Sequence, residues 1–146
     1  MKVVVQRVKE ASCTVNNERI SSIKDGLLLL VGFTHDDTIE DVHFMAKKIA
    51  NLRIFEDENH RMNKSILDMN YDILSISQFT LYGDTRKGNR PSFIDAMKPK
   101  QAKHLYEQLS SILSNIYGIT TYNGVFGEMM DIRLINSGPV TIELEK

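Results

Sequence analysis

The segment that most restricts the fold is an uninterrupted apolar run, "LLLLVGF", over residues 27–33. A strand with one face in water alternates apolar and polar residues, whereas this run is apolar on both faces. It therefore predicts a central strand that is covered on both sides. The preceding "KVVVQRV" also reads as a strand, with Val3, Val5 and Arg7 on one face.

The remaining chain alternates between short strand patterns and two helical patterns. The first helix begins at Asp37 or Thr38, and the second begins at Pro99 and ends near Gly118, where a helix-ending glycine is common. Further strands are predicted over residues 19–23, 52–55, 73–81, 120–123, 130–135 and 140–144. We therefore expect a single domain over residues 1–146, of the α+β class, with a mostly antiparallel or mixed sheet and two main helices.

Composition narrows the functional classes. Cys13 is the only cysteine, which excludes an intrachain disulfide and fits a reducing compartment. No apolar run approaches the length of a membrane span and no signal peptide is apparent, so we expect a cytoplasmic protein. The net charge is −1, yet six basic residues face one acid, Asp95, between residues 85 and 104. That segment could meet phosphates, or it could be an ordinary solvated surface.

Familiar catalytic motifs are absent. The four histidines are scattered without metal-ligand spacing, so no metal site is predicted. Glycine-rich nucleotide-binding loops and the G-x-S-x-G hydrolase motif are also missing.

Arg7 is the first unusual residue, because a guanidinium among valines must be paired or must point at a site. The alternative is an edge position from which Arg7 reaches solvent. The second unusual feature is the strand face of Leu74 and Ile76, which continues as the polar Gln78 and Thr80. Either a pocket rim or a fraying strand end would give this pattern.

The third unusual feature is Gly138-Pro139, which interrupts the last strand pattern, since proline cannot donate to a ladder. A trans proline at an edge or bulge would be the purely structural explanation.

Two long motifs, "SQFTLYGDTRKGNRPSF" (77–93) and "NSGPVT" (136–141), closely resemble the signature regions of D-aminoacyl-tRNA deacylases. "QRVKEASCTV", "RIFEDENHRMN" and "GVFGEMM" are similar to the same family, so the resemblance covers the whole chain. It implies hydrolysis of the ester between a D-amino acid, or misattached glycine, and the 3′ end of tRNA. It also implies a homodimer with sites at an interface built from the sheets, and no metal or organic cofactor.

By the same resemblance, Gly138-Pro139 would be cis and would project from one subunit into the active site of the other. Its carbonyl oxygens would hold the substrate amino group and leave no room for an L side chain. Arg7 would hold this region in place.

The resemblance places catalysis on Ser77, Gln78, Phe79 and Thr80. The Phe79 backbone N–H would polarise the ester carbonyl, with the ribose 2′-OH assisting attack. Ser77 and Gln78 would position the adenosine and the ester, and Thr80 would have a supporting role because no base is identifiable beside it.

Contacts with the tRNA are expected at two further places. Arg86, Lys87 and Arg90 would face phosphates of the acceptor stem. Phe126 and Met130 would either lie beneath the terminal adenine or belong to the core.

The chain departs from the family pattern at two positions. Ser137 stands where an acidic residue is more common, and Glu128 stands where small residues are usual. Glu128 could alter the lining of the site that Phe126 and Met130 would form beside the adenine.

Two other functions remain open. A non-catalytic nucleic-acid-binding dimer could use the basic region 86–103. A serine- or threonine-dependent hydrolase of another ester is the third possibility.

Overall fold

The fold is described from a computed structural model that covers residues 1–146. Its centre is the long strand β1 (Lys2–Val15), which pairs antiparallel with β2 (Glu18–Ile23), β3 (Gly26–Gly32) and β8 (Asp131–Glu145). The strand β6 (Asp72–Ser77) adds parallel to β3, and β7 (Thr121–Asn123) adds parallel to β6. β3 and β2 pair with successive stretches of β1 along one edge and β8 pairs along the other edge, while β6 and β7 extend the sheet beyond β3, which confirms a mixed sheet in an α+β fold.

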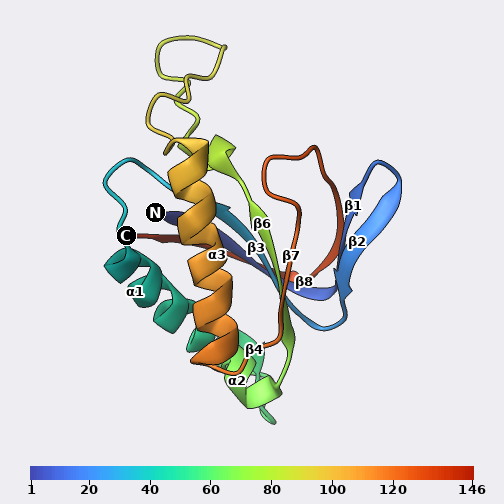
Figure 1. Ribbon diagram of the computed structural model, residues 1–146. Coiled ribbons are helices and arrows are strands. Elements are labelled where there is room, and N and C mark those ends of the chain that lie inside the picture. The colour runs from blue at the N-terminus through green and yellow to red at the C-terminus, as the bar shows by residue number, and fades with distance from the viewer.

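Two helices cover the sheet. The helices α1 (Ile39–Ala50) and α3 (Pro99–Asn115) lie side by side on it (Figure 1) and share one large core with β1, β3 and β6. A smaller apolar cluster fills the opposite face, with Leu28 and Leu74 fully buried there. The prediction that the leucine-rich strand is covered on both faces is therefore confirmed.

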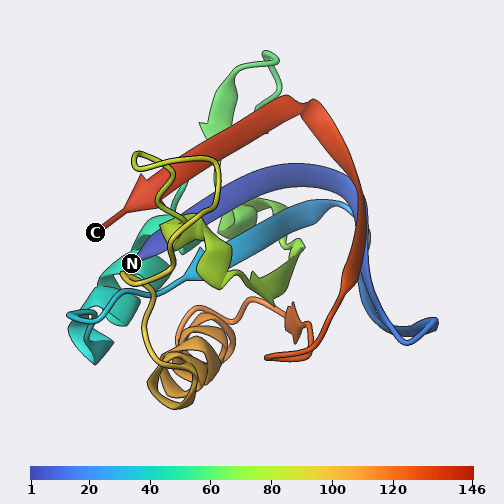
Figure 2. The ribbon, with the colours of Figure 1, turned by 90° about the horizontal axis from the view of Figure 1, so that it is seen from above.

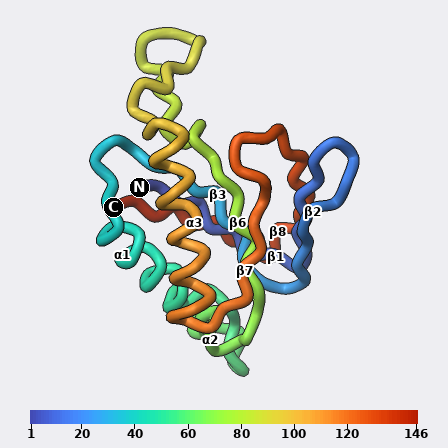
Figure 3. The backbone as a smooth tube through the Cα atoms, in the orientation of Figure 1, coloured from blue at the N-terminus to red at the C-terminus, as the bar shows by residue number.

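Four short elements complete the chain. They are β4 (Phe55–Glu56) and β5 (Met62–Lys64), which form a separate hairpin, a short helix α2 (Ile66–Met69), and a 3₁₀ helix η1 (Phe79–Tyr82). Figure 3 follows the backbone through them and through the long loop that stands above α3.

The two helices begin where the sequence predicts. Thr38 is the N-cap of α1, where its backbone N–H and its hydroxyl both contact the Asp41 carboxylate, and Pro99 is the first residue of α3. Gly118 follows α3 with φ at +68°, a left-handed conformation that is usual just after a helix.

Three predicted strand boundaries are wrong. The strand expected over residues 73–81 ends at Ser77, because the chain turns into η1. The strand expected over 52–55 is reduced to Phe55–Glu56. The two strands expected over 130–135 and 140–144 are one continuous strand, β8. Figure 2 shows that this strand bends sharply partway along its length. The ladder with β1 shifts register on both sides of Val8, so β8 passes Gly138-Pro139 without ending.

Candidate active site

The first part of the site lies where the parallel strands β3 and β6 end together. The Gln78 N–H donates to the Val31 carbonyl over 2.7 Å, and the chain then winds into η1. The turn lies directly on Gly32, where a Cβ would come within 2.9 Å of the Gln78 carbonyl oxygen. Glycine at the end of β3 therefore allows the 3₁₀ helix to fold back over the sheet edge.

The hydroxyls of this segment have no base beside them. Gln78 Nε2 donates to Thr80 Oγ1, and no histidine or carboxylate is hydrogen-bonded to Ser77 or Thr80. A serine or threonine nucleophile needs such a partner. Phe79 occupies the first position of η1, where backbone N–H groups have no acceptor within the helix. The segment therefore offers a backbone donor and no activated nucleophile.

An aromatic neighbour of Phe79 was not predicted from sequence. The rings of Phe79 and Phe93 meet edge to face, with centroids 5.1 Å apart. The only sequence signal for this pair is the phenylalanine near each end of the motif 77–93.

The second part of the site surrounds Gly138-Pro139, whose peptide bond is cis. Arg7 is buried beside it: Nη1 donates to the Ile54 carbonyl over 2.7 Å and Nε donates to the Ser137 carbonyl over 3.2 Å. Nη2 lies 3.8 Å from Glu56 Oε1. The expectation that Arg7 is paired is confirmed, and the solvent-reaching alternative is wrong.

Gly138 fits against this guanidinium because it has no side chain. A Cβ at Gly138 would lie 2.8 Å from Arg7 Nη2, and φ there is +119°, a conformation nearly restricted to glycine. A cavity of about 460 Å³ opens beside these residues, lined also by Tyr71 and Glu56. Arg7 thus fixes the backbone that precedes Pro139.

One chain does not bring these two parts together. Val8 pairs with Asn136 on one side and Gly26 on the other, whereas Val31, five residues further along β3, pairs with Ser77. At ~3.3 Å per residue, the offset of five residues places the segment before Gly138-Pro139 about 16 Å along the strands from the start of η1. The spacing between strands across the sheet adds to this distance.

The predicted adenine contacts are half-buried. Phe126 packs against the Tyr106 ring with centroids 5.8 Å apart, and Met130 packs on the smaller apolar cluster. Tyr106 donates to the Ser75 carbonyl over 2.6 Å, and burial raises the pKa of its phenol to about 12. Glu128 is exposed in the turn between them.

In the basic loop between η1 and α3, only some of the basic side chains lack an acidic partner within the protein. Arg86 forms two hydrogen bonds with the Asp84 carboxylate, over 2.9 and 2.8 Å, and these lower the pKa of Asp84 to about 2. Lys87 and Arg90 are exposed and form no salt bridge. Of the three predicted phosphate contacts, two are available and one is engaged within the loop.

No group of three or more His, Cys, Asp or Glu side chains is placed to hold a metal ion. None of the helices has the length and apolar character needed to cross a membrane.

Comparison with known proteins gives the same family along the whole chain. Residues 4–145 match the family model described as D-Tyr-tRNA(Tyr) deacylase. The D-aminoacyl-tRNA deacylase of Anoxybacillus flavithermus is 59% identical over 145 residues, which is 99% of each chain. The D-aminoacyl-tRNA deacylase of Exiguobacterium sibiricum is 56% identical over 146 residues and the full length of both.

Two solved structures share the fold. One, named c-Myc DNA Unwinding Element Binding Protein, superposes with a TM-score of 0.95 at 44% identity over 100% of this chain and 99% of that one. The other, a probable eukaryotic D-amino acid tRNA deacylase, has a TM-score of 0.85 at 18% identity over 98% and 97% of the chains. From the family match and these relatives, the chain belongs to the D-Tyr-tRNA(Tyr) deacylase family.

Proposed function

We propose that this protein hydrolyses the ester bond of D-aminoacyl-tRNA, and of mischarged glycyl-tRNA, to the free amino acid and tRNA. Family membership over residues 4–145 supports this reaction, as do the relatives named D-aminoacyl-tRNA deacylase. Residues 1–146 act as one domain, in the cytoplasm and on the 3′ end of tRNA, in a quality-control step of translation.

The chemistry at η1 uses water as the nucleophile. Water attacks the ester carbonyl carbon, and the negative charge that develops on the carbonyl oxygen is stabilised by the Phe79 N–H. The ribose 2′-OH assists this attack. Collapse of the tetrahedral intermediate then expels the ribose 3′-oxygen, which takes the proton that the attacking water gives up. The Gln78–Thr80 hydrogen bond orients the Gln78 amide toward substrate, and Ser77 helps to position the adenosine.

The active enzyme is a homodimer in which Gly138-Pro139 of one subunit completes the η1 site of the other. The observation that carries this step is the separation of the two motifs within one chain. The backbone carbonyls of Gly138 and Pro139 accept hydrogen bonds from the substrate amino group. An L side chain would collide with that backbone, while glycine has no side chain to be rejected.

The remaining contacts with the tRNA are made by residues outside η1 and Gly138-Pro139. Lys87 and Arg90 face phosphates of the acceptor stem, and Phe126 with Met130 forms the floor beneath the terminal adenine. No step of the proposed reaction requires a metal or organic cofactor.

The test is hydrolysis of D-tyrosyl-tRNA and L-tyrosyl-tRNA in parallel, at low enzyme and with no metal added. Rapid loss of the D ester with the L ester intact is the expected result. Loss of neither ester would overturn the proposed reaction, and equal loss of both would overturn the role of Gly138-Pro139.

A second candidate is a nucleic-acid-binding protein without hydrolytic activity. One observation favours it: the solved relative at 44% identity is named as a protein that binds a DNA element. Tight DNA or RNA binding by a protein that leaves both esters intact would support this candidate in place of the deacylase.

A further inference from the structure

We propose that the rings of Phe79 and Phe93 form a stacking site for the unpaired nucleobase that precedes the terminal adenosine of the tRNA. This inference rests on the proposed function and extends it by one nucleotide. The ligand class is an unstacked base with its 5′ phosphate, which is bound without reading its sequence.

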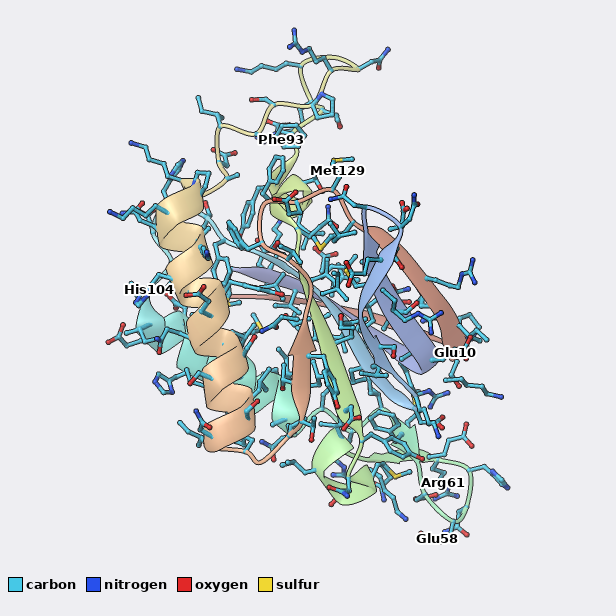
Figure 4. All side chains as sticks on the ribbon, turned by 45° about the vertical axis from the view of Figure 1, so that its right-hand side comes forward. Glu10, Glu58, Arg61, Phe93, His104 and Met129 are labelled. Carbon is cyan, nitrogen blue, oxygen red and sulfur yellow. The ribbon has the colours of Figure 1, made fainter.

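The two rings are exposed although they are large and apolar. Phe79 is 57% exposed and Phe93 is 38% exposed, and they meet at an interplanar angle of 71°. Ile94, beside Phe93 in the chain, is 77% exposed, and Met129 is 90% exposed. Figure 4 shows Phe93 and Met129 at the same end of the molecule, where β6 runs into η1. Single exposed apolar residues are ordinary, but a contacting aromatic pair beside a candidate active site is typical of a binding surface.

The backbone around Phe93 is fixed on both sides. Before it, Asp84 and Ser92 exchange two backbone hydrogen bonds of 2.8 and 2.9 Å. After it, Thr34 Oγ1 donates to the Asp95 carbonyl over 2.6 Å. The Phe93 ring is therefore partly exposed and already positioned, so a base that stacks on it orders little of the protein.

The charges around the pair favour a nucleotide over an apolar partner. Lys87 and Arg90 lie between Asp84 and Ser92 in the same loop and have no acidic partner, whereas Arg86 is held by Asp84. Aromatic faces beside free cations are the common arrangement for single-stranded nucleic acid. Since η1 is the proposed site of the ester, the base that reaches the pair is the one adjoining the terminal adenosine.

The experiment compares two substrates that differ only in the tRNA beyond the terminal adenosine. D-tyrosyl-tRNA carries the neighbouring nucleotide, and the D-tyrosyl ester of adenosine alone does not. Phe93→Leu should raise KM for the tRNA roughly 5- to 150-fold, because stacking on an aromatic contributes about 1–3 kcal/mol per base, and should leave kcat little changed. It should leave the adenosine ester unaffected, and Phe93→Tyr should behave as the wild type with both substrates.

A matched control is available on α1. Phe44 is 46% exposed and far in sequence from the site, so Phe44→Leu should change neither substrate. A direct readout is the fluorescence of a short RNA with 2-aminopurine in the penultimate position, which stacking quenches. Wild type and Phe93→Tyr should quench it, and Phe93→Leu should not.

Three outcomes would overturn the inference. If Phe93→Leu impaired hydrolysis of both substrates equally, Phe93 would only support the structure of η1. Dissociation of Phe93→Leu in sedimentation would mean that a second copy covers the rings. Unchanged KM and quenching would mean that no base stacks there. If the wild type hydrolyses neither substrate, the proposed function fails, which is a distinguishable result.

Discussion

Replacing Gly138 by alanine tests the packing on which the second part of the site depends. The new Cβ would lie 2.8 Å from Arg7 Nη2 and 2.9 Å from Val140 Cγ2, at a φ of +119°. A long arginine could ordinarily swing away, but Arg7 is held by its bonds to the Ile54 and Ser137 carbonyls. Relief of the clash therefore breaks at least one of these bonds.

The expected loss of stability has two parts. Forcing a non-glycine residue into this φ costs about 1–3 kcal/mol. Loss of one hydrogen bond from a charged donor costs about 1.5–3 kcal/mol. Together they predict that Gly138→Ala lowers the free energy of unfolding by about 2.5–6 kcal/mol.

Gly88→Ala is the matched control, because its φ is +140° and a Cβ there would meet nothing within 4 Å. Gly88→Ala should lose only the stability that corresponds to a non-glycine residue at positive φ. Urea unfolding of both variants at one fixed protein concentration measures the difference, since the stability of the proposed dimer would depend on concentration. A loss for Gly138→Ala no larger than that for Gly88→Ala would refute the argument that Arg7 occupies the space of the missing side chain.

Four further results are expected. Arg7→Ala should raise hydrolysis of L-tyrosyl-tRNA at least about tenfold relative to the D ester, because Gly138-Pro139 loses its support; an unchanged D/L ratio contradicts this. Phe79→Pro removes the backbone N–H and should lower kcat roughly 100-fold or more, whereas Phe79→Ala keeps the N–H and most of kcat. Thr80→Ala should retain substantial activity in the same assay, and a dead variant would restore the nucleophile model. The Asp84 carboxyl should titrate by NMR near pH 2, so the Arg86 contact persists above pH ~4 and is lost only as pH falls through about 2; Arg86→Ala should return it toward ~3.9.

Features set by local chemistry could be predicted from the sequence. The apolar run 27–33 predicts a buried strand, and the caps at Thr38 and Pro99 predict helix starts, because each depends on a few neighbouring residues. The small helix α2 was missed, although Ser65 and Asp68 form a capping box that could have been found.

Features set by contacts distant in sequence could not be predicted. The strand through Ser77 ends because the chain turns over Gly32, which lies 45 positions earlier. Arg7 is paired by the carbonyls of Ile54 and Ser137, and neither partner carries a side-chain signal. The roles of both site motifs came from the resemblance to a family, because the residue pattern alone left structural explanations open.

We propose that each active site combines η1 of one subunit with Gly138-Pro139 of the other. A heterodimer tests it most directly, with Phe79→Pro in one subunit and Arg7→Ala in its partner, separated by two purification tags. Its one working η1 then faces the intact Gly138-Pro139 of the other chain. This heterodimer should hydrolyse D-tyrosyl-tRNA and spare L-tyrosyl-tRNA. Hydrolysis of the L ester to the extent seen with the Arg7→Ala homodimer would contradict it, because the filter would then act within its own chain.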